Sequence, residues 1–130
     1  MIIGIDLDNT LIDYRKAFWK TALVTRILVE NDKRSISNNE NSFPSKNEIK
    51  NYLLKLENGD FQWESLQGQV YGKYIYQAQV FPGVANFLLH CRRRGNKIYI
   101  ISHKTKFGHH DKSKTSLRKS ALNFLKNNDL

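Results

Sequence analysis

Cysteine, long apolar runs and acidic residues near the C-terminus are all scarce in this sequence. The single cysteine, Cys91, has no partner for an internal disulfide, which favours a reducing, cytoplasmic setting. No apolar run reaches the roughly 20 residues that cross a bilayer, so we expect no membrane partner. The stretch from Met1 to Asp6 is too short and carries an acid too early for a signal peptide.

Acidic residues are nearly missing from the last third of the chain. Residues 90–130 contain eleven lysines and arginines but only two acids, Asp111 and Asp129, whereas the charges of residues 1–89 cancel. The whole net charge of +9 therefore lies in this third. Such a basic field could attract phosphorylated ligands or nucleic acid. A solvated basic face is the favoured interpretation, and nucleic-acid binding stays open.

The patterns that are present alternate between strand and helix. Residues 2–6 and 97–101 are short isoleucine-rich runs and are predicted as buried strands. Residues 31–42 are polar and are predicted as a loop. Apolar residues at helical spacing predict helices at 14–29, 46–57, 64–79, 83–94 and 115–127. Strands followed by helices predict an α/β fold in which the two strands are adjacent and parallel.

The segment between the two strands is long and helical. It is too large for one crossover helix, so residues 13–79 are predicted to form a helical lobe beside the sheet. Ser45 and Glu48 have the spacing of a capping box, which predicts a helix start inside this lobe. Residues 1–12 and 80–130 remain for the part that contains the sheet.

Two carboxylates follow the first predicted strand. Asp6 and Asp8 are two residues apart, so in an extended chain both point to one face. They stand at the C-terminal end of a parallel strand, where open α/β sheets bind ligands. A hard divalent cation such as Mg²⁺ would relieve their repulsion. One carboxylate could attack a phosphoryl group while the other handles protons. A pair of turn or capping acids is the alternative.

Two stretches together resemble the haloacid dehalogenase superfamily. Gly4-Ile5-Asp6-Leu7-Asp8-Asn9-Thr10-Leu11 is similar to its first signature, a hydrophobic strand followed by Asp-x-Asp-x-Thr. Phe81-Pro82-Gly83-Val84, with the strand that leads into Ser102, is similar to the second, and Ser102-His103-Lys104-Thr105 resembles members with Ser-His-Lys there. The resemblance implies an incomplete Rossmann-like parallel sheet, residues 1–12 and 80–130, with a helical cap, residues 13–79, inserted after the first strand.

The resemblance also implies roles for the two acids. Asp6 would be the nucleophile, and Asp8 would be the acid and base. Both would hold Mg²⁺, Asp6 through its carboxylate and Asp8 through its backbone carbonyl. An acid at position 8 favours phosphoryl chemistry over dehalogenation, because a leaving oxygen needs a proton.

Five further residues are implied as substrate contacts. Asn9 and His103 would offer backbone N–H groups to the phosphoryl oxygens, and Ser102 would offer its hydroxyl. Thr10 and Lys104 complete this set. The substrate would be a small phosphorylated molecule.

Two later signatures of the superfamily are not found. They would supply a lysine that neutralises nucleophile and phosphate and, after a further strand, an acidic pair for the metal. No further apolar strand follows Ser102, and the only later acids are Asp111 and Asp129. Four lysines are near enough to be considered and are expected on the surface instead: Lys104, Lys106, Lys112 and Lys114.

The sequence thus predicts a Mg²⁺-dependent phosphomonoester hydrolase or phosphotransferase that works through an aspartyl-phosphate. As it stands, the chain is expected to be nearly inactive, as a fragment that needs a missing C-terminal part of the same domain. The alternative is a catalytically inactive protein that binds phosphate or nucleic acid through its basic last third. For the enzyme, Asp6, Asp8 and Ser102 must converge on one crevice.

Overall fold

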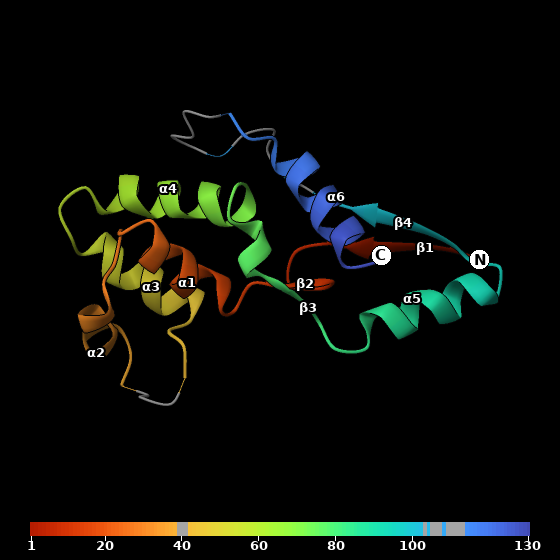
Figure 1. The fold of residues 1–130 in the computed structure, drawn as a ribbon, viewed down its shortest axis with the longest axis horizontal. Coiled ribbons are helices and arrows are strands. Elements are labelled where there is room, and N and C mark those ends of the chain that lie inside the picture. The colour runs from red at the N-terminus through yellow and green to blue at the C-terminus, as the bar shows by residue number, and fades with distance from the viewer. Residues whose placement is uncertain (39–41, 103, 105–107, 109–113) are drawn as a thin grey trace.

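The structure is a computed structural model that describes residues 1–38, 42–102, 104, 108 and 114–130. The described residues form a mixed α/β fold with six α-helices and a parallel pair of strands. The arrangement is elongated: the four helices between residues 17 and 71 gather at one end and the parallel pair lies at the other (Figure 1). Among these helices, none is both long and apolar enough to cross a membrane.

Strands β1 (Ile2–Asp6) and β4 (Lys97–Ile101) are adjacent and parallel, which confirms the prediction. Their register aligns Ile2 with Lys97 and Asp6 with Ile101, so both strands end at the same edge. Helix α5 (Val84–Arg93) precedes β4 and packs against it. The segments that follow β1 and β4 therefore start side by side.

The prediction that both strands are buried is wrong. Ile2, Tyr99, Ile100 and Ile101 expose between 45% and 71% of their surface. Within the described residues no third strand pairs with β1 or β4, so part of the apolar pair stays uncovered. Ile5 is the member of β1 that is buried, because it joins the hydrophobic core.

The predicted helices exist, but several have different ends. Helix α1 spans Ala17–Val24 rather than residues 14–29, and Arg26 beyond it has a left-handed φ of 60°. Helix α3 spans Lys46–Leu54 and begins with the predicted capping box, in which Ser45 and Glu48 exchange two hydrogen bonds of 3.1 Å. The capping residues were therefore a better guide to a helix end than apolar periodicity.

Helix α4 (Gly59–Tyr71) begins earlier and ends earlier than predicted. Asn58 turns the chain with a left-handed φ of 58°, and Gly59 follows so closely on α3 that a Cβ there would lie 2.0 Å from the Leu53 carbonyl oxygen. After Tyr71 the helix gives way to a separate 3₁₀ turn, η2 (Ile75–Gln77). One predicted helix is thus a helix followed by a short turn.

The predicted loop at residues 31–42 is also partly helical. It contains a 3₁₀ turn, η1 (Glu30–Asp32), and the short helix α2 (Lys33–Ile36). The Asp32 carboxylate accepts a hydrogen bond of 2.9 Å from the Val29 N–H, which satisfies a free donor at the start of the turn. A polar composition did not reveal this local capping.

Two short strands join the ends of the helical segment. β2 (Ile12–Asp13) and β3 (Gln79–Val80) pair antiparallel, with Ile12 opposite Val80. Next to them, the Phe81 N–H donates to the Leu11 carbonyl oxygen over 3.1 Å. Two residues give too little alternation for a strand prediction, although this pairing holds the start and the end of residues 13–79 together.

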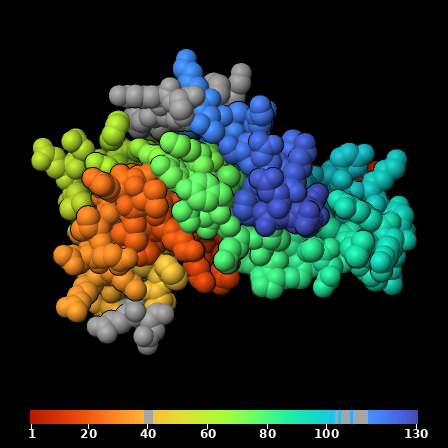
Figure 2. Space-filling view, in the orientation of Figure 1, coloured from red at the N-terminus to blue at the C-terminus, as the bar shows by residue number. Residues whose placement is uncertain are grey.

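The last helix, α6 (Leu117–Asn127), packs against α4 and η2. The sequence assigned it to the part that contains the sheet, yet it lies on the helical segment as well. Figure 2 shows α6 on the same face as the residues that follow α4.

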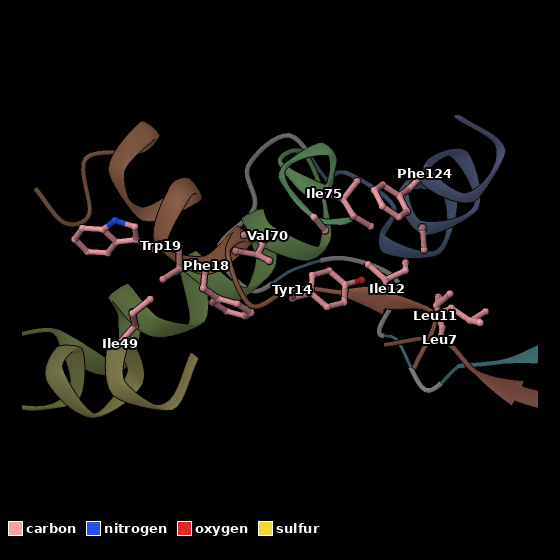
Figure 3. Close-up of a cluster of buried hydrophobic side chains, with 14 of the residues drawn as sticks. Leu7, Leu11, Ile12, Tyr14, Phe18, Trp19, Ile49, Val70, Ile75 and Phe124 are labelled. Carbon is pink, nitrogen blue, oxygen red and sulfur yellow. The ribbon is translucent and has the colours of Figure 1, made fainter. Parts of the chain in front are cut away.

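One continuous cluster of buried side chains connects the helices to the sheet. It runs from Trp19 and Ile49 through Phe18 and Tyr14 to the apolar residues just after β1 (Figure 3). The rings of Phe18 and Trp63 stack with centroids 5.5 Å apart, and Phe18 is fully buried. The segment after β1 is therefore anchored by packing on the helical core.

Candidate active site

A tight turn follows β1 and carries the candidate acids. The Leu7 carbonyl oxygen accepts hydrogen bonds from the N–H groups of Leu11 and Ile12, at 3.0 and 3.1 Å. Asn9 adopts a left-handed φ of 60°, a conformation that asparagine tolerates better than most residues. Leu7, Leu11 and Ile12 are buried. Their packing anchors the turn, while the Asp8 side chain stays partly exposed.

The Asp8 carboxylate is held at both oxygens. The buried Tyr14 hydroxyl donates to its Oδ1 atom over 2.6 Å. The Lys104 ammonium lies 2.9 Å from its Oδ2 atom. Asp8 is 29% exposed at its side chain, so it is oriented by the protein and still reaches solvent.

Lys104 is buried, so its expected surface position is wrong. Its side chain is 4% exposed, and its ammonium lies 4.2 Å from the centroid of the Tyr71 ring and 5.7 Å from that of Tyr14. Aromatic faces attract cations, and more strongly when water is excluded. The two tyrosine rings, 4.9 Å apart and perpendicular, thus help to hold the cation beside Asp8. Of the other lysines considered, Lys114 is exposed, and Lys106 and Lys112 lie outside the described residues.

The Lys104 ammonium keeps unused hydrogen-bonding capacity. Its contact with the Asp8 carboxylate is an ion pair of 2.9 Å. Among the described residues no group accepts a hydrogen bond from this buried nitrogen. An ammonium has three donors, so a ligand with several acceptor oxygens would accept hydrogen bonds that the described residues do not.

The same burial changes the acidity of the two tyrosines. Burial, together with the hydrogen bond to Asp8, raises the pKa of the Tyr14 hydroxyl well above its ordinary value. Burial and the negative charge of Asp8 raise the pKa of Tyr71 to about 12. Both hydroxyls therefore keep their protons at neutral pH, and Tyr14 acts as a hydrogen-bond donor to Asp8.

One cavity of about 430 Å³ brings most of the predicted site together. Asp6, Asp8, Ser102 and Lys104 all line it, as the convergence of the two strand ends requires. Helix α4 forms the opposite wall, with Glu64, Gln67, Gly68 and Tyr71. We call this space the Asp8 cavity.

Two of the predicted contacts, from Asn9 and Thr10, are not found there. The Asn9 N–H donates to the Ile12 carbonyl oxygen over 2.9 Å, so in this conformation it is not available to a phosphoryl oxygen as we expected. Thr10 is exposed and is not among the residues that line the Asp8 cavity. His103 lies outside the described residues.

Sequence reasoning missed the helical wall of the cavity. Tyr14 and Tyr71 fit apolar stripes, and their hydroxyls gave no signal of a polar role. Gly68 offers a clue: a Cβ at Gly108 would lie 2.5 Å from the Gly68 Cα atom, so two glycines let residue 108 approach α4. Such a close approach depends on residues distant in sequence.

The described residues offer a small donor set for Mg²⁺. No three acidic, histidine or cysteine side chains among them gather as a metal site. Mg²⁺ is nevertheless bound in many proteins by one or two carboxylates, substrate phosphate and water. The exposed Asp6 carboxylate fits that pattern. The Asp8 carboxylate is engaged by Tyr14 and Lys104, so Asp8 would contribute its backbone carbonyl.

Comparisons with known proteins identify no relative of this chain. No family model, curated protein or solved structure matches this chain. The resemblance to the haloacid dehalogenase superfamily therefore rests on the motif residues. The geometry around Asp8 stands independently of it.

Proposed function

We propose that this chain carries Mg²⁺-dependent phosphoryl-transfer chemistry in the Asp8 cavity, acting on a small phosphorylated substrate. In this proposal the chain belongs to the haloacid dehalogenase superfamily, β1 and β4 are part of a Rossmann-like sheet, and residues 13–79 form its cap. A cytoplasmic setting remains part of the proposal, on the ground of the single cysteine. The roles of Asp6 and Asp8 in it are those that the resemblance implies.

The observation that carries the proposal is the buried Lys104 ammonium. It lies 2.9 Å from Asp8 at the end of a side chain that lines the cavity shared by Asp6 and Ser102, and no described residue accepts a hydrogen bond from it. A phosphoryl group supplies several acceptor oxygens and negative charge. Repulsion between a carboxylate and one phosphate charge at 4 Å amounts to about 4 kcal/mol at an effective dielectric near 20. Lys104 would offset that repulsion at Asp6.

The acids divide the reaction between them. A carboxylate oxygen of Asp6 forms a bond to phosphorus while the bond from phosphorus to the leaving oxygen breaks. When the substrate phosphate pairs with the Lys104 ammonium, Asp8 takes up a proton from solvent and gives it to that leaving oxygen; the resulting carboxylate then takes a proton from the water that attacks the aspartyl-phosphate. Inorganic phosphate leaves and the Asp6 carboxylate is restored. The hydrogen bond from Tyr14 keeps Asp8 in one orientation through both proton transfers.

The remaining groups bind and orient the substrate. Ser102 would donate its hydroxyl to a phosphoryl oxygen. Mg²⁺, held by the Asp6 carboxylate and the Asp8 carbonyl, would supply further positive charge. Glu64 and Gln67, on the α4 wall of the cavity, would contact the substrate.

Single-turnover labelling tests the proposal even if turnover is slow. The chain is incubated with acetyl phosphate and Mg²⁺, and the gain of one phosphoryl group is located by mass spectrometry. We expect the label on Asp6, none in Asp6→Asn, and at least a hundredfold slower labelling in Lys104→Gln, the size of loss typical for a charge-stabilising group. Lys126→Gln, on the exposed side of α6, is the matched control.

Three results would count against the proposal. They are no label on a folded chain, a label that persists in Asp6→Asn, and equal losses in Lys104→Gln and Lys126→Gln. Turnover of an aryl phosphate is measured alongside. It is expected to be slow for these 130 residues, since the acidic pair of the superfamily pattern is not recognisable in the sequence.

A second candidate function rests on the basic surface. The described lysines and arginines of the last third, apart from Lys104, are all exposed: Arg92, Arg93, Arg94, Lys97, Lys114, Arg118, Lys119 and Lys126. In this alternative the chain binds phosphate or nucleic acid without catalysis. It predicts binding to duplex DNA or RNA that weakens steeply with salt and is unaffected by Asp6→Asn.

A further inference from the structure

A second cavity lies on the other side of Tyr14. It measures about 650 Å³, is larger than the Asp8 cavity, and is lined by the end of the turn after β1, the start of α1 and the start of α3. Three basic side chains, Arg15, Lys16 and Lys46, line it, and Asp13 is the one acid among the lining residues. We call this space the basic cavity.

The charge of the basic cavity comes from two lysines. Asp13 is fully engaged by Arg15, whose Nε and Nη2 atoms lie 2.6 to 3.0 Å from its carboxylate oxygens. The hydrogen bond from Arg15 holds the pKa of Asp13 below its ordinary value. Both side chains therefore stay ionised, and their opposite charges cancel. Among the described residues, the two ammonium groups of Lys16 and Lys46 therefore have no carboxylate at ion-pair distance.

Both lysines are oriented by aromatic rings rather than by acids. The Lys46 ammonium donates to the Tyr71 hydroxyl over 3.2 Å and lies 5.5 Å from the centroid of the Phe18 ring. The Lys16 ammonium lies 5.5 Å from the centroid of the Phe43 ring. Phe43 is 41% exposed and lines the same cavity. A cation next to an accessible ring suits a ligand with both negative charge and an apolar part.

The two cavities are separated by a wall of tyrosines. Tyr14 lines the basic cavity while its hydroxyl reaches Asp8 on the other side. Tyr71 lines the Asp8 cavity while its hydroxyl accepts a hydrogen bond from Lys46. Lys46 and Lys104 thus contact the same ring from different cavities. An anion bound by Lys16 and Lys46 would occupy a site distinct from the one around Asp8.

We propose that the basic cavity is a second anion-binding site, for a small organic anion whose phosphate or carboxylate group lies between Lys16 and Lys46 and whose apolar part packs on Phe43. The chemistry fits because lysine binds such groups as a point charge and because no described acid neutralises the pair. This inference does not rest on the proposed function of the Asp8 cavity. It holds equally for an enzyme and for a binding protein.

Benzylphosphonate, which has no ester bond to hydrolyse, is a suitable probe. Its binding to the full chain is measured by calorimetry at low ionic strength, beside methylphosphonate and neutral benzyl alcohol. We expect benzylphosphonate to bind in the millimolar range or better. Methylphosphonate, which lacks the ring, and benzyl alcohol, which lacks the charge, should both bind more weakly.

Variants locate the probe. Lys16→Gln and Lys46→Gln should each weaken benzylphosphonate binding about tenfold or more, the loss expected for one charge-assisted contact. Phe43→Ser should remove the preference for benzylphosphonate over methylphosphonate. Lys55→Gln, an exposed lysine at the far end of α3, makes the same charge change outside the cavity and should leave binding unchanged.

Several outcomes would overturn the inference. Undetectable benzylphosphonate binding would do so, as would equal losses in Lys46→Gln and Lys55→Gln, or equal binding of benzyl alcohol. A loss confined to Lys104→Gln would place the anion in the Asp8 cavity and also overturn it. Because Lys46 contacts Tyr71, thermal unfolding of each variant is recorded. Lys16 is exposed, so Lys16→Gln should not affect folding. If the folded Lys16→Gln variant still binds benzylphosphonate as tightly as the wild type, the proposed site is wrong.

Discussion

The Lys104 ammonium and the Asp8 carboxylate lie 2.9 Å apart and connect the segments that follow two neighbouring strands. The lysine side chain is almost fully buried, whereas the carboxylate keeps part of its exposure. A pair in such a position is less screened than a surface ion pair. Losing one partner is therefore expected to cost more than losing a surface charge.

A double-mutant cycle measures this coupling. Lys104→Gln should lower the free energy of unfolding by about 1–3 kcal/mol, because it leaves the Asp8 carboxylate without its counter-charge. Combined with Asp8→Asn, the loss should be smaller than the sum of the single losses by about 1 kcal/mol. Urea unfolding at neutral pH gives the three values. Strict additivity would mean that the two groups do not interact in solution.

The hydroxyl of Tyr14 is the second partner of Asp8. Tyr14→Phe keeps the buried ring but removes the hydrogen bond of 2.6 Å, and should lower the free energy of unfolding by about 1 kcal/mol. Tyr76→Phe is the control, since Tyr76 is 64% exposed. Equal effects of the two substitutions would show that the hydroxyl of Tyr14 does not stabilise the fold.

Alkaline pH should destabilise the protein through its buried tyrosines. Burial raises the pKa of Tyr71 from 10.0 to about 12, so the unfolded chain loses this proton at a lower pH than the folded chain. The resulting stability is complete below pH 10 and is lost as the pH rises toward 12. Tyr71→Phe removes this contribution, so its unfolding free energy should fall less steeply across that range. Parallel curves for wild type and variant would contradict the assignment.

Two glycines make a sharp steric comparison. Gly59→Ala would place a Cβ 2.0 Å from the backbone oxygen of Leu53, which cannot yield without moving α3 or α4, and should cost about 3 kcal/mol or more. Gly4→Ala would place one 2.7 Å from the Cδ1 atom at the end of the Ile101 side chain. Ile101 is half exposed and can rotate away, so the cost should be about 1 kcal/mol. Thermal unfolding of both variants measures the two losses of stability. Similar losses in Gly59→Ala and Gly4→Ala would contradict this prediction.

Local patterns predicted the elements well but not the contacts of the site. The strands at 2–6 and 97–101 and the cap at Ser45 depend on neighbouring residues, and each is found as predicted. Strand ends alone implied that Asp6, Asp8 and Ser102 would meet, and they line one cavity. These predictions needed no knowledge of distant packing.

Lys104 and Tyr14 show where such reasoning ends. A lysine in a polar stretch is usually exposed, and nothing nearby in sequence reveals that Tyr71, on another helix, covers it. The apolar spacing predicts Tyr14 as the first residue of a helix. The helix α1 begins three residues later, and the Tyr14 hydroxyl reaches back to Asp8 instead. Both assignments depend on pairs that only the folded chain brings together.

The parallel pairing of β1 with β4 also constrains the order in which the molecule can fold. Ile2 meets Lys97, so the sheet closes a loop that contains nearly three quarters of the chain, and long loops of this kind are slow to close. The helices between residues 17 and 71 make shorter-range contacts with one another and can form first. On a ribosome, β1 emerges before β4 and must wait for it. We therefore expect Asp8 to meet Lys104 late in folding, after the helical wall of the candidate site has formed.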